Sequence, residues 1–198
     1  KRGGAKRILS GASKLSALVK GSNYPNLDVL PARFSFRRAD TVLDARTDAS
    51  RRFSKLIAPL EQHYDLLVFD CAPGLSLIAE SVMHAADGVL VPVIPTTLSL
   101  RTLTMLHDHC ASQMGSAVAL LPFLSMVDVR RRLHRDVCND PSMFAVAPLS
   151  TRIPYASQVE RMGVERAPLC AFAPSSLAGR AYAGLWREVH SAITATAK

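Results

Sequence analysis

The stretch that decides the fold is an apolar run ending in a carboxylate, Tyr64-Asp65-Leu66-Leu67-Val68-Phe69-Asp70-Cys71-Ala72-Pro73-Gly74. Four consecutive apolar residues at 66–69 predict a strand that is covered on both faces, as in a parallel sheet. Such a strand delivers Asp70 to the carboxyl edge of the sheet, where open α/β sheets bind ligands. A carboxylate there can hold a Mg²⁺-bound water beside nucleotide phosphates, although a strand-ending Asp more often only caps the next turn.

On either side of this stretch, short apolar runs alternate with helical patterns. This alternation is typical of a doubly wound α/β fold, a mostly parallel sheet flanked by helices. We expect strands at 27–30, 66–70, 89–93, 118–124 and 145–149, and helices at 48–63, 76–86, 98–113, 130–139 and 155–162. A final helix is predicted beyond Ser175, because apolar side chains then recur every four residues, at Leu177, Ala181, Leu185 and Val189.

The composition fits one globular domain, with 48% hydrophobic and 20% charged residues among 198. We expect a basic, Gly/Ser-rich lead-in at 1–22, with a short helix near Leu15, and one domain at 23–198. No apolar run approaches the ~20 residues of a membrane span. Four widely spaced cysteines indicate a reducing cytoplasm rather than a disulfide framework. A formal net charge of +8 favours an anionic partner such as nucleic acid or nucleotide.

Several segments occur in the order found in the ParA/MinD family of P-loop ATPases, which the chain resembles from about residue 22 to 190. Residues 25–32 resemble the family motif P-N-L-D-L-L-P-A, residues 70–74 resemble D-x-P-P-x, and residues 85–93 resemble A-A-D-x-V-L-V-P-V. Residues 99–103 resemble S-L-x-x-L, and residues 124–130 resemble L-T-M-x-D-x-R. No single motif is decisive, but their shared order is specific.

Two features of that family are missing from the sequence. The phosphate-binding K-G-G-x-G-K-[ST] motif is absent, and so is a strand ending in D-x-D-P-Q. The segment Lys1-Arg2-Gly3-Gly4-Ala5-Lys6-Arg7 does not replace the first of these, because no strand precedes it and no Gly-Lys-Ser/Thr ending follows. We therefore expect a domain that lacks its first one or two strands, and that alone is inactive as an ATPase.

The resemblance implies a function for the complete protein: an ATP- and Mg²⁺-dependent partition ATPase that segregates plasmids or chromosomes. It implies a homodimer formed with ATP, nonspecific DNA binding, a ParB-like activating partner, no membrane association, and a bacterial cytoplasmic, nucleoid-associated location. Asp70 would be the catalytic residue that orients Mg²⁺ through a water. The adenine end would be contacted by Met126, Asp128, Ile153 and Pro154.

The densest basic cluster comes directly after Asp128, and the family's use of basic residues in this half implies that it contacts DNA phosphates. Its members, with one further residue, are Arg130, Arg131, Arg132, Arg135 and Arg152. Two alternatives stay open. A MinD-like membrane-cycling ATPase would need an amphipathic tail, whereas residues 190–198 are small and weakly apolar. A non-catalytic DNA-binding or scaffold relative that lacks the P-loop is the other.

Overall fold

The computed structural model describes residues 15–32, 48–114 and 118–196. The chain divides into two compact units, Lys1–Ala86 and Asp87–Lys198. Within the described ranges, no helix is both long enough and apolar enough to cross a bilayer.

The first unit is built around helix α3 (Ala49–Glu61) and helix α4 (Leu77–Ala85). A 3₁₀ helix η1 (Leu15–Leu18), where a short helix was expected, packs its buried Leu15 against α3. Strands β1 (Lys20–Gly21) and β2 (Asp28–Val29) form a short antiparallel pair rather than part of a parallel sheet. The core of the unit consists of Leu15, Phe53, Ile57, Leu60 and Val82.

The strand predicted at 66–70 is wrong for the described residues, where this segment has no regular secondary structure and pairs with no strand. A strand exists only through hydrogen bonds to a neighbour, and an apolar run cannot supply that neighbour. Val68 is accordingly 81% exposed. The segment is anchored by side chains instead: Tyr64 donates a hydrogen bond to Asp28 over 2.7 Å, and Leu67 packs against the core.

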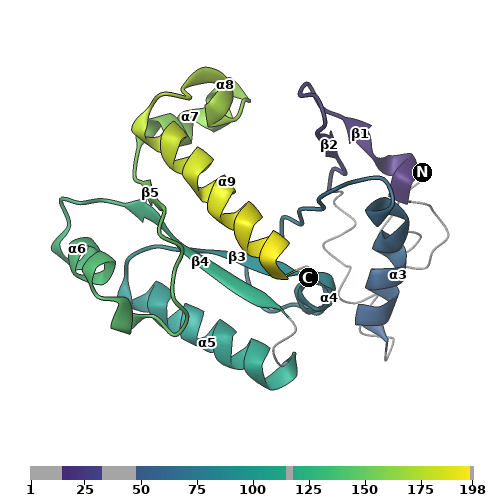
Figure 1. The fold of residues 1–198 in the computed structure, drawn as a ribbon, viewed down its shortest axis with the longest axis horizontal. Helices are drawn as coiled ribbons and strands as arrows, with labels where there is room; N and C mark the ends of the chain where they lie inside the picture. The colour runs from purple at the N-terminus through teal and green to yellow at the C-terminus, as the bar shows by residue number, and fades with distance from the viewer. Residues whose placement is uncertain (1–14, 33–47, 115–117, 197–198) are drawn as a thin grey trace. The chain divides into compact units, whose positions relative to one another are not determined.

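The second unit holds a parallel sheet in the order β3-β4-β5 (Figure 1). Its strands are β3 (Gly88–Val93), β4 (Ala119–Val127) and β5 (Arg152–Pro154). Its helices are α5 (Thr97–Gln113), α6 (Arg132–Asn139), α7 (Ser157–Glu165), α8 (Leu169–Phe172) and α9 (Leu177–Thr196), with a 3₁₀ turn η3 at Pro141–Met143.

Helices cover both faces of this sheet. On one face, Leu100 and Leu103 of α5 and Val137 of α6 pack against Val93 and Leu124. On the other, α9 packs through side chains that include Leu185 and Val189 against residues of β4 and β5. The doubly wound α/β class predicted from the sequence is therefore confirmed, and all six predicted helices form.

The strand predicted at 145–149 is wrong: the ladder with β4 begins only at Arg152. Pro148 has no backbone N–H to donate, so a continuous ladder through this segment is disfavoured. Leu149 contributes a main-chain bond, from its N–H to the Pro122 carbonyl of β4 over 2.7 Å.

Candidate functional site

Asp70 lies at the end of the unpaired segment 66–70 in the first unit, and its side chain is exposed. The preceding ring, Phe69, packs edge-on against Phe53 of α3, with centroids 5.4 Å apart. After it, Gly74 adopts a φ of +103°, and Ser76 caps α4 by accepting a hydrogen bond from the Ala79 N–H. Among the described residues, no hydrogen bond or ion pair uses the Asp70 carboxylate. It is therefore available as an oxygen ligand.

The other predicted site residues belong to the second unit, around a bulge near the carboxyl end of β4. Leu124 lies opposite Arg152 and Val127 opposite Pro154, so β4 contains one extra residue. Met126, within the bulge, has a left-handed φ of +55°, which is uncommon for a residue other than glycine. The extra residue places both Leu124 and Val127 in the core beneath α5 and α6, and leaves Met126 46% exposed.

Directly beyond the bulge, Asp128 and Arg130 form a two-pronged ion pair. The Nε and Nη2 atoms of Arg130 donate to the two carboxylate oxygens over 2.9 Å each, and the Arg130 backbone N–H donates to Oδ1 over 3.1 Å. The side-chain bonds first, and then the backbone bond, lower the pKa of Asp128 from 3.8 to about 2. The pair thereby joins the first and third residues of the turn at 128–131.

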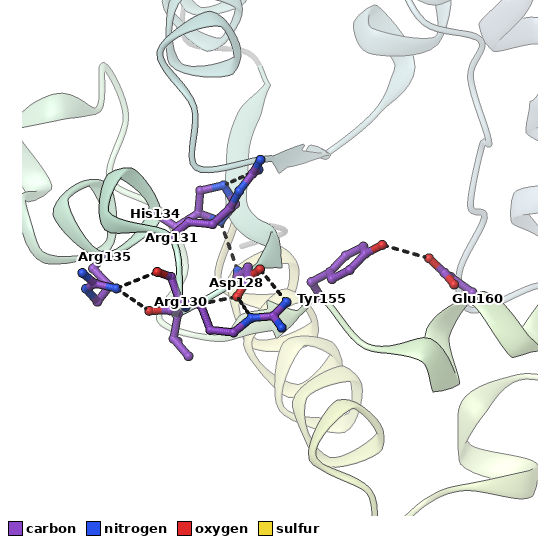
Figure 2. A network of polar contacts seen from close by, with 8 residues as sticks. Asp128, Arg130, Arg131, His134, Arg135, Tyr155 and Glu160 are labelled. Atoms are coloured by element: carbon purple, nitrogen blue, oxygen red, sulfur yellow. Dashed lines mark hydrogen bonds and ion pairs between the residues drawn. The ribbon is translucent and has the colours of Figure 1, made fainter.

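Helix α6 holds the same turn from the other side, as Figure 2 shows. His134 is 2% exposed, and its Nδ1 accepts a hydrogen bond from the Asp128 backbone N–H over 3.1 Å. Arg135 donates through Nη1 to the carbonyl oxygens of Val129, over 2.8 Å, and Arg130, over 3.0 Å. The turn is therefore fixed by hydrogen bonds from two successive residues of one helix.

These contacts divide the five arginines predicted to bind DNA. Arg130 and Arg135 hold the turn, and Arg152 donates through Nη2 to the Cys138 carbonyl at the end of α6, over 2.6 Å. Each of these guanidinium groups therefore supports the local fold, and removing one would disturb main-chain geometry as well as charge.

Arg131 and Arg132 are held far more weakly. The Nη1 atom of Arg131 lies 3.5 Å from the Nε2 atom of His134. The Nε atom of Arg132 lies 3.7 Å from an Asp136 oxygen, and both of these side chains are mostly exposed. Exposed pairs of this kind contribute little to stability. These two guanidinium groups are thus the ones that an external anion can engage without breaking the turn.

A pocket of about 340 Å³ lies within this unit, among α6, β5 and α9. Of the residues predicted near the adenine, only Pro154 lines it. Ile153 is 1% exposed and packs with Phe123 and Leu185, so any contact it makes with a ligand involves its main chain. The pocket is lined by Val127, Val129, His134, Arg135, Cys138, Asn139, Arg152, Pro154, Leu177 and Ala181.

The sequence analysis did not single out His134. Its helical spacing from Val137 offered a signal, because a polar residue that shares a face with a core residue is a candidate for a buried hydrogen bond. Nothing in the spacing identifies the partner, since the Asp128 N–H is a main-chain group reached through a turn.

Comparison with known proteins places the chain in a family. A family model described as an AAA domain (AAA_31) matches residues 5–114. The sporulation initiation inhibitor protein Soj of Bacillus subtilis is 24% identical over 190 residues, which cover 92% of this chain and 74% of Soj. The chromosome-partitioning ATPase Soj of Treponema pallidum is 23% identical over 187 residues, with the same coverage. This chain is a member of the ParA/MinD family of P-loop ATPases.

The solved structures agree on the fold of this ParA/MinD member. The ATP complex of a Cyanothece McdA variant superposes with a TM-score of 0.79 at 12% identity, covering 96% of this chain and 76% of that one. At this identity the likeness concerns the fold alone. The ParA/MinD assignment made from the ordered motifs is confirmed.

Proposed function

We propose that this chain acts in a ParA-type partition ATPase, an ATP-dependent dimer switch that binds DNA without sequence preference in partitioning plasmids or chromosomes. The observation that carries the proposal is the turn at 128–131. It presents Arg131 and Arg132 outward from a main-chain frame held by Asp128, His134 and Arg135. Cations fixed on a rigid frame suit the phosphate backbone, which binds proteins by charge and position rather than by base identity.

The proposal assigns Mg²⁺ binding to a residue of the first unit and nucleotide contacts to residues of the second. The exposed Asp70 carboxylate is an oxygen ligand of the kind that Mg²⁺ prefers, directly or through a bound water. When bound, Mg²⁺ would neutralise charge on the transferring phosphate. Both oxygens of Asp128 are already bonded to Arg130, so Asp128 would shape the adenine end by holding its turn, together with Met126 and the main chain at Ile153 and Pro154.

Binding of the ATP phosphates needs a structural element beyond the residues described above. The sequence contains no Gly-Lys-Ser/Thr motif, so in this proposal ATP hydrolysis requires a phosphate cradle and lysine that the 198 residues do not contain. In the proposed cycle the ATP-bound homodimer holds DNA, and hydrolysis stimulated by a ParB-like protein releases it. The proposed location is the nucleoid in a bacterial cytoplasm, without membrane association.

The experiment that tests the proposal compares DNA with membrane as the anionic partner. A preparation that hydrolyses ATP, and so includes the phosphate cradle, is sedimented with Mg-ATP and two duplexes of unrelated sequence, and separately with phosphatidylglycerol vesicles. We expect similar affinity for both duplexes and no binding to vesicles. Vesicle binding without DNA binding would instead support a MinD-like membrane cycle, and strong preference for one duplex would contradict nonspecific binding.

A further inference from the structure

His134, drawn in Figure 2, is 2% exposed, and its two ring nitrogens lie beside the two ends of the turn at 128–131. The Nδ1 atom of His134 accepts from the Asp128 N–H, so in the neutral ring the proton must sit on Nε2. The Nε2 atom then faces Arg131, whose Nη1 lies 3.5 Å away. One ring therefore bonds the first residue of the turn and stands beside the outward-facing arginine at its end.

We propose that His134 is the positioning residue of the proposed DNA-binding turn: its ring holds the turn at 128–131 through the hydrogen bond that Nδ1 accepts from the Asp128 N–H. This inference rests on the proposed function for its biological meaning, although its structural part does not. It concerns placement of Arg131 and Arg132, not direct contact between His134 and DNA.

Two substitutions separate the hydrogen bond from the bulk of the ring. His134→Asn keeps an acceptor, because Oδ1 occupies the same position on Cγ as Nδ1, but does not titrate. His134→Phe keeps a ring without an acceptor. Neither asparagine nor phenylalanine is ionisable, so the two variants carry the same charge. A difference between them then reports the hydrogen bond rather than charge.

Hydrogen exchange of the Asp128 amide tests the structural part directly. We expect protection in the wild type and in His134→Asn, and roughly tenfold faster exchange in His134→Phe. Equal protection in all three proteins would overturn the inference. If His134→Phe does not fold, His134→Leu, which also lacks an acceptor and is smaller, takes its place in the same comparison.

DNA affinity at about pH 8 separates this inference from the proposed function. We expect His134→Phe to bind roughly two- to tenfold more weakly than the wild type, and His134→Asn to restore binding. Affinity unchanged in His134→Phe would overturn the positioning role. If the wild type itself binds no DNA while the exchange results hold, the proposed function fails, and the control of the turn by His134 stands.

Discussion

The guanidinium group of Arg130 binds both carboxylate oxygens of Asp128, through Nε to Oδ1 and through Nη2 to Oδ2, each over 2.9 Å. The two residues are only two positions apart, so the pair closes a turn rather than joining distant elements. Arg130 therefore acts first as part of the frame, and its substitution would change the turn along with the surface charge.

This pair predicts a dependence of stability on acid pH. The pKa of Asp128 is lowered to about 2 from 3.8, so the unfolded chain binds the proton more tightly than the folded one. The stabilisation is complete above about pH 4 and is lost as pH falls towards 2. Unfolding midpoints across this range should therefore fall less steeply for Asp128→Asn than for the wild type. Parallel profiles would show that the pair adds nothing to stability.

Substitution by alanine should have opposite effects on stability at two helical glycines, because one lies in a close contact and the other does not. A Cβ at Gly179, in α9, would meet the loop that precedes this helix, where the Pro174 carbonyl oxygen is 2.7 Å away and the Ala173 carbonyl oxygen is closer still. Gly179→Ala should lower the free energy of unfolding by ~1–3 kcal/mol through overpacking. Gly163, inside α7, has nothing within 4 Å of its added Cβ.

The matched control is Gly163→Ala, which should raise the free energy of unfolding by ~0.5–1 kcal/mol, because alanine favours a helix interior over glycine. Denaturant unfolding measures both. A tolerated Gly179→Ala would mean that α9 does not approach the 173–174 carbonyls so closely.

Nucleotide binding by the chain itself should be negligible. Phosphates in this class of ATPase are held by a nest of backbone N–H groups and a lysine, and the 198 residues contain no Gly-Lys-Ser/Thr motif that would form one. Calorimetry with Mg-ATP measures this directly. Micromolar affinity would show that the phosphate site lies elsewhere in the sequence.

In a preparation that hydrolyses ATP, Asp70→Ala should reduce kcat by about a hundredfold or more, because a Mg²⁺ partner is lost. The melting curve should change little, since Asp70 is exposed. Asp65→Ala is the control, because it removes an exposed carboxylate from the same segment. Unchanged turnover in Asp70→Ala would show that Asp70 has no part in hydrolysis and only shapes the turn that follows it.

The helices were predictable from the sequence because their determinants are local. Leu100 and Leu103 lie on one face of α5, and Thr96 caps that helix by accepting from the Ser99 N–H. The strand at 66–70 was not predictable, because a ladder needs a distant partner. Apolar character alone made it look like β3, which does have one.

The clustering of arginines at the candidate site was predictable from the sequence, but the role of each arginine was not. Four arginines within six positions are visible in the sequence, whereas the division between them is not. That division depends on a bulge at Met126, which gives no clear sequence signal, and on main-chain acceptors such as the Val129 carbonyl. The role of His134 depends on the same turn and could be seen only once the turn was in place.

The central claim is that Arg131 and Arg132 contact DNA phosphates, and the salt dependence of DNA binding tests it most directly. Each phosphate contact contributes about −0.9 to the slope of log K against log salt concentration. Arg131→Gln with Arg132→Gln should therefore flatten the slope by up to about 1.8, without the loss of fold expected on replacing Arg130 or Arg135. Arg161→Gln with Arg187→Gln removes the same charge from α7 and α9 and should leave the slope nearly unchanged. Equal slopes for the wild type and the Arg131/Arg132 variant would contradict the account.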